Sequence, residues 1–160
     1  MATRIALAVL IFAAFAFGQS TSAVETTEYP TVIYAEVPLY PAIARAAHIT
    51  GTVEIQITVE KGAVVHAQVK SVVLGSSNGA VLNDEGKKKV GLYLSNTAVA
   101  NVKTWRFQPQ GGASFLVTYV YKIEGEQTSL PENPKVEMDL PRRVTVTAKP
   151  SKPYCSDGCG

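Results

Sequence analysis

Three segments between residues 52 and 123 alternate apolar and polar side chains, as do strands with one buried and one solvated face. The first segment runs from Thr52 to Glu60, and Lys61-Gly62 after it predicts a tight hairpin turn. The returning strand is expected to turn four side chains inward: Val65, Ala67, Val69 and Ser71. Its outward side chains are then His66, Gln68 and Lys70. The third strand is expected from Ser114 to Ile123, with one face formed by Phe115, Val117, Tyr119, Tyr121 and Ile123.

A helical period separates the second and third of these strands. Apolar residues recur there at intervals of four, four and three, at Leu94, Ala98, Val102 and Trp105. Pro109 stops the helix that this pattern predicts. Its start is open between a cap at Ser95 or Asn96 and an earlier start near Asp84-Glu85, and Gly91 favours the later one.

Shorter elements flank this series. Pro41 and the alanine-rich residues up to His48 predict a short helix before the first strand. After Gly125, the segment Lys135–Ala148 predicts two short edge strands, because proline is tolerated at an edge, and it is a candidate to pair with the free edge of the sheet. The predicted fold class is therefore α+β: a three-stranded antiparallel sheet with one main helix packed on it, in the order short helix-β-β-α-β, with extra C-terminal edge strands.

The N-terminal residues predict export. Met1–Arg4 is short and positive, Ile5–Phe17 is an unbroken apolar run, and small residues follow. As a helix this run would span about 20 Å, whereas a bilayer core needs about 30 Å. We expect residues 1–23 to be a signal peptide, cut after Gly18 or Ala23, in preference to a retained inner-membrane anchor.

The rest of the chain is expected to form one domain with flanking segments. We assign a linker at 24–36, the domain at 37–125, an extension with short strands at 126–148 and a flexible tail at 149–160. Cys155 and Cys159 lie in that tail, and an exported chain meets oxidising conditions, so a local disulfide is expected. An unpaired or intermolecular thiol is the alternative. A metal site is not expected, because neither His48 nor His66 is near the cysteines in sequence.

Charge and motif content exclude several functions. The chain has 15 Lys and Arg against 13 Asp and Glu, with no basic stretch beyond Lys87-Lys88-Lys89, so nucleic-acid binding is not expected. No nucleophile elbow, metal-binding histidine pair or phosphate loop occurs. Glu54 and Glu60 lie about 20 Å apart on one strand, too far to act on one bond. We expect no catalytic residue, cofactor or small-molecule substrate.

Four landmarks occur in a particular order along the chain. They are Tyr40-Pro41 before the short helix, Gly51-Thr52-Val53 at the first strand, Lys61-Gly62 at the hairpin tip and Trp105-Arg106-Phe107-Gln108-Pro109 after the helix. In this order they resemble the C-terminal domain of TonB energy transducers. The resemblance covers about Val37 to Gly125. The chain resembles a stand-alone exported member of that family, without the transmembrane anchor and the proline-rich spacer.

The resemblance implies a periplasmic protein-binding module. Such domains add an extended peptide, the TonB box of an outer-membrane receptor, to their sheet by β-augmentation. The residues that correspond here to the receiving strand and the segment beside it are Tyr40, Pro41, Val117, Thr118, Tyr119, Val120, Tyr121, Lys122 and Ile123. The implied partner is an envelope protein, with a TonB-dependent receptor and transmembrane transport as one setting. The alternative is a structural or self-associating envelope protein whose sheet edge is closed by its own tail; a homodimer is open in either case.

Overall fold

The computed structural model describes residues 29–109, 111–128 and 132–151. Its strands are β1 (Val32–Tyr34), β2 (Ile49–Glu60), β3 (Ala63–Ser76), β4 (Arg106–Phe107), β5 (Ala113–Ile123), β6 (Lys135–Asp139) and β7 (Arg143–Ala148). Its helices are α1 (Ala42–Ala46) and α2 (Asp84–Val102). The predicted signal peptide and the predicted disulfide between Cys155 and Cys159 lie outside the described residues.

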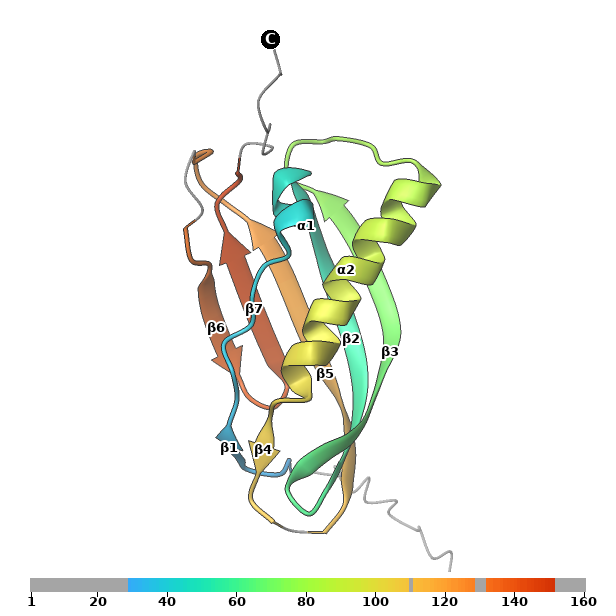
Figure 1. The fold of residues 1–160 in the computed structure, drawn as a ribbon, viewed down its shortest axis with the longest axis vertical. Helices are drawn as coiled ribbons and strands as arrows, with labels where there is room; N and C mark the ends of the chain where they lie inside the picture. The colour runs from blue at the N-terminus through green and yellow to red at the C-terminus, as the bar shows by residue number, and fades with distance from the viewer. Residues whose placement is uncertain (1–28, 110, 129–131, 152–160) are drawn as a thin grey trace, which may run out of the picture.

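All seven strands belong to one mixed sheet, in the order β1-β4-β3-β2-β5-β7-β6, which curls into a half-barrel with α2 on its inner face (Figure 1). The predicted fold class, a three-stranded antiparallel sheet with one main helix, is therefore wrong. Strands β1 and β4 have three and two residues, too few to produce a periodic pattern in the sequence. At the other side β7 pairs parallel with β5, a long-range pairing that side-chain alternation does not report.

The β2–β3 hairpin is the longest pairing in the sheet, and its tip has the expected turn. Lys61 and Gly62 both have positive φ, at 50° and 81°, as a two-residue hairpin turn requires. A side chain at Gly62 would also collide with the Phe107 carbonyl, because a Cβ there would lie 2.5 Å from that oxygen. Phe107 in turn donates its backbone N–H to the Gly62 carbonyl at 2.9 Å. The hairpin tip is thus fixed against β4.

Two bulges in β3 change which of its side chains face inward. The register with β2 shifts between Glu54 and Ile55 and again between Thr58 and Val59. Each shift leaves one β3 residue, Lys70 or Val65, opposite no partner. Ala67 and Val69 remain on the inner face beside Ile57 and Ile55, as expected. The prediction for Val65 and Ser71 is wrong: Val65 is 56% exposed, and Ser71 donates a hydrogen bond to Glu54 at 2.7 Å on the outer face.

Helix α2 begins at the earlier of the two predicted starts. Asn83 caps it, and its side-chain oxygen accepts a hydrogen bond from the Gly86 N–H at 2.8 Å. The apolar stripe packs as expected: Leu94, Ala98 and Val102 are fully buried against the sheet. Trp105 follows the helix and is also fully buried.

A hydrogen-bond network centred on Asn101 joins α2 to the sheet and to the N-terminal segment. The Asn101 side-chain oxygen accepts from the Tyr119 hydroxyl at 2.7 Å and from the Trp105 indole N–H at 3.3 Å. The Asn101 amide N–H donates to the Glu36 carbonyl at 2.9 Å. Buried polar groups are costly unless they are paired, so this network fixes the relative position of α2, β5 and residue 36.

Three buried tyrosines are expected to make the fold less stable at alkaline pH. Burial raises the pKa of Tyr40, Tyr119 and Tyr121 above the ordinary value of about 10. Because the folded state holds these protons more tightly than the unfolded chain, stability is full below pH 10 and is lost as pH rises above it. Each group contributes about 1.4 kcal/mol per pH unit there. Urea unfolding at pH 9 and pH 11 measures this loss; equal stability at both would contradict it.

Removal of the hydroxyl is expected to change the free energy of unfolding differently at Tyr119 and at Tyr121. Among the described residues the Tyr121 hydroxyl has no hydrogen-bond partner, whereas that of Tyr119 donates to Asn101. We expect Tyr121→Phe to leave the free energy of unfolding unchanged or raise it by about 1 kcal/mol, and Tyr119→Phe to lower it by about 1 kcal/mol. Denaturant unfolding at pH 7 compares them, and a reversed order would show that the hydroxyl environments are misassigned.

Candidate functional site

The predicted peptide-receiving strand lies in the interior of the sheet. Strand β5 pairs antiparallel with β2 on one side and parallel with β7 on the other. The β7 pairing runs from Thr118 opposite Arg143 to Ile123 opposite Ala148, and so covers nearly all of the predicted segment. The backbone of Thr118–Ile123 is therefore paired on both sides, and a peptide could add there only by displacing β7.

Side chains of the predicted site are divided between the two faces of the sheet. Val117, Tyr119, Tyr121 and Ile123 are buried on the inner face, while Thr118, Val120 and Lys122 lie on the outer face. The structure does bring Tyr40 to β5: its ring meets that of Tyr121 edge-on, with centroids 5.4 Å apart. Tyr40 is itself buried and donates to the Ile49 carbonyl at 2.7 Å. Pro41 occupies the N-cap position of α1. Tyr40 and the inward-facing residues of β5 therefore belong to the core.

Strand β7 is held by buried side chains of its own. Val144 and Val146 are fully buried, and Ala148 is 3% exposed. On its far side β7 pairs antiparallel with the whole of β6, from Arg143 opposite Asp139 to Thr147 opposite Lys135. The predicted extension is thus part of the packed sheet, and burial of its apolar side chains opposes its release.

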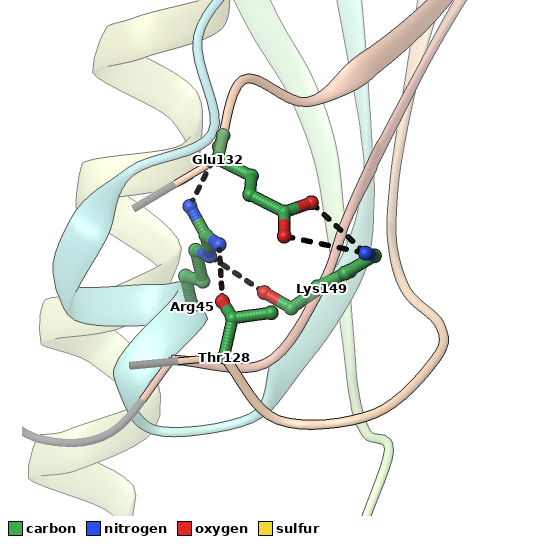
Figure 2. A network of polar contacts seen from close by, with 4 residues as sticks. All are labelled: Arg45, Thr128, Glu132 and Lys149. Carbon is green, nitrogen blue, oxygen red and sulfur yellow. Dashed lines mark hydrogen bonds and ion pairs between the residues drawn. The ribbon is translucent and has the colours of Figure 1, made fainter. Parts of the chain in front are cut away.

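A buried arginine also ties the extension to α1 (Figure 2). Arg45 donates from Nε to the Lys149 carbonyl at 2.6 Å and from Nη1 to the Glu132 carbonyl at 3.0 Å, with Nη2 3.5 Å from the Thr128 hydroxyl. The Glu132 carboxylate pairs with the Lys149 ammonium at 2.9 Å. Arg45 as a residue is 7% exposed, and its guanidinium donates to neutral oxygens, so its role here is to hold the C-terminal segment against α1.

Within the described part of the chain, three strands have a side without a strand neighbour. The first is β1, a three-residue strand at one end of the sheet. The second is β6 at the other end, which carries exposed charges, including the Lys135–Glu137 ion pair at 2.7 Å. Charged side chains on a short edge strand discourage pairing with another chain. The third is β3, which meets β4 only where Ala63 lies opposite Arg106. Beyond Ala63 no described strand lies along that side of β3.

The last six residues of β3 are Ser71–Ser76, and none of them pairs with β4; we call them the β3 edge segment. They follow the second bulge and pair with β2 without a register shift. Val73 is 65% exposed on the outer face. Val72 and Leu74 lie on the inner face, where they line a groove between β3 and α2. A free backbone edge and apolar side chains therefore occur together.

The groove has a volume of about 740 Å³ and follows one stripe of α2. Two rows of helix residues spaced by four positions line it: Lys87, Gly91 and Ser95 in one row, and Lys88, Leu92 and Asn96 in the other. Gly91 and Ser95 are small, which leaves room between the helix and the strand. Gly91 is buried, and a Cβ there would lie 3.6 Å from a Val72 methyl carbon, in ordinary contact.

This edge was not predicted from the sequence, because alternation along β3 indicates one solvated face but does not show which strands lie beside it. One signal was present: the run Val72-Val73-Leu74 has no polar interruption, although a strand with one solvated face should alternate. Such a run predicts that both faces are covered. On the outer face this prediction is not met within the chain, because Val73 is exposed.

Among the described residues, no three His, Cys, Asp or Glu side chains gather closely enough to hold a metal ion. None of the helices in the described part of the chain has the length and apolar content needed to cross a bilayer. When the sequence is compared with models of known protein families and with curated proteins, no family model and no curated protein matches it significantly.

We expect backbone amides to exchange at different rates in the β3 edge segment and in β5. Amides of the β3 edge segment that point away from β2 have no strand partner, whereas those of Thr118–Ile123 lie between two strands. We expect outward amides in Ser71–Ser76 to exchange about 100-fold faster than the β5 amides. Hydrogen exchange followed by NMR measures both in one sample. Equal protection would mean that the β3 edge is covered.

Proposed function

We propose that this chain is a protein-binding module that recognises an extended peptide of an envelope protein by strand addition. The observation that carries the proposal is the free β3 edge segment beside an apolar groove. Main-chain hydrogen bonds to such an edge supply affinity, and pockets for alternate side chains supply selectivity. The exposed Val73 side chain and the apolar floor of the groove give both faces of an added strand an apolar neighbour.

The export expected from the N-terminal sequence and the resemblance to the TonB C-terminal domain supply the setting of this proposal. A cleaved signal peptide would place the domain in the periplasm, where a TonB-dependent receptor is one partner of the right class. The resemblance points to β5 as the receiving strand. Because β7 pairs with β5 along Thr118–Ile123, we assign the addition to β3 at the opposite side of the hairpin.

A structural or self-associating role is the second candidate, and the closed β5 edge favours it. A domain that seals one edge with its own strand and presents charged residues on β6 is protected against adventitious pairing on that side. In this role the β3 edge would take a second copy of the chain. The two candidates therefore differ in what occupies the same segment.

Affinity for a short peptide should be modest. A six-residue segment offers about three outward backbone pairs in a ladder, each contributing about 1 kcal/mol net, and ordering the peptide offsets part of this. Burial in the groove adds the remainder. We expect dissociation constants on the order of micromolar.

A peptide selection with matched variants tests the proposal. Random twelve-residue peptides are selected on the immobilised chain 24–160, and the enriched sequences are measured by calorimetry. Val73→Asn should weaken them at least about fivefold, since a cross-strand neighbour loses its apolar contact. Leu116→Asn is the control, because Leu116 is also exposed, at 47%, but lies on interior β5.

Equal weakening by Val73→Asn and Leu116→Asn would place the binding surface on the outer face of the sheet. Enrichment of no peptide would contradict the proposed function itself. Both variants keep the charge of the chain, so long-range electrostatics does not enter the comparison.

A further inference from the structure

The groove beside the β3 edge segment is apolar along most of its length and cationic at one end. Its strand side is formed by Val69, Val72 and Leu74. On α2 the lining residues begin with Lys87 and Lys88, continue through Gly91 and Leu92 and end at Ser95 and Asn96. The helix follows β3 after a short loop, so its first turns lie beside the end of the strand (Figure 1). The cations thus stand at the Leu74 end.

These cations are not neutralised within the groove. No acidic residue lines it. Lys87 has one carboxylate nearby, with its Nζ 3.8 Å from an Asp84 oxygen, but both side chains are more than half exposed. Ion pairs of this kind contribute little. Lys88 forms no ion pair with another described residue.

We propose that the groove takes an extended peptide with apolar side chains at alternate positions and carboxylates at the end that lies beside Lys87 and Lys88. This inference rests on the proposed function and specifies the chemistry of the peptide. Alternate side chains of an added strand face the helix side, where Val72, Leu74 and Leu92 accept apolar groups. The terminal carboxylates then neutralise the two ammonium groups.

Charge also argues against a second copy as the occupant. In a two-fold pairing each copy would present its own Ser71–Ser76 to the groove of the other. That segment, Ser-Val-Val-Leu-Gly-Ser, contains no carboxylate to meet the lysines. Pairing of two copies would therefore leave two cationic groove ends without a partner charge.

Three peptides of ten residues test the inference on the full mature chain. All carry valine at alternate central positions, and they differ only in two flanking residues at each end, which are Glu, Gln or Lys. Charges at both ends make the comparison independent of strand direction. At low salt the Glu peptide should bind about fivefold tighter than the Gln peptide, with the Lys peptide weakest, and added salt should reduce these differences.

A matched pair of charge reversals locates the effect. Lys88→Glu should abolish the preference for the Glu peptide over the Gln peptide. Lys89→Glu should leave that preference within about twofold, because Lys89 is an exposed neighbour on the same helix that does not line the groove. Both variants change the net charge equally, so a difference between them is local.

The outcomes separate the two proposals. If all three peptides bind equally and Val73→Asn weakens them, strand addition holds and the charge inference is overturned. Equal responses of the Lys88 and Lys89 variants also overturn it. If none of the three binds, strand addition of short peptides at this edge fails as well. A dimer in sedimentation equilibrium that Val73→Asn dissociates would show that a second copy occupies the segment, contrary to the inference.

Discussion

Parallel pairing of β7 with β5 is the interaction that decides which strand of the sheet can accept a partner strand. It turns the strand that would otherwise be an edge into an interior strand, and buries Val144 and Val146 completely. The Arg45 hydrogen bonds to the Glu132 and Lys149 carbonyls hold the chain just before β6 and just after β7. Displacement of β7 would expose core side chains, and displacement that also moved Lys149 would take one acceptor from the buried Arg45 guanidinium. Both costs oppose opening of the β5 edge.

Closure at β5 determines where a partner strand can add. Of the edges left within the described residues, β1 has only three residues and β6 is short and charged, whereas β3 ends in a six-residue segment with apolar side chains at its centre. The bulges at Val65 and Lys70 interrupt the first part of β3 and so protect it, which leaves Ser71–Ser76 as the regular stretch. Small residues on α2 keep the helix from filling the space beside that stretch. Backbone access and side-chain space are thus confined to one place.

Much of the central fold could be predicted from the sequence. Alternation identified β2, β5 and the inner face of Tyr119 and Tyr121, and the stripe through Leu94 and Val102 identified the packed face of α2. These predictions succeeded because burial acts on each side chain locally, with a period fixed by the backbone. The same reasoning misplaced Val65 and Ser71, since a single bulge reverses the phase of every later side chain without a signal of its own.

The order of neighbouring strands in the sheet could not be predicted from the sequence. The segment Lys135–Ala148 was a candidate to pair with a free edge. Nothing in its alternation shows that β7 lies between β5 and β6, or that it runs parallel to β5. The candidate site followed this error, because it assumed that the third predicted strand was an edge. The β1–β4 pairing was missed for a different reason: a two-residue strand such as Arg106–Phe107 is made by its tertiary neighbours.

The most direct test of this account is to locate a bound peptide by NMR. Intermolecular contacts are measured between a selected peptide and the labelled chain, together with amide protection along β5. We expect contacts to Ser71–Ser76 and to α2 near Gly91, with the amide protection of Thr118–Ile123 unchanged. Contacts to β5, accompanied by loss of protection in β7, would contradict it and show that the partner displaces the chain's own strand.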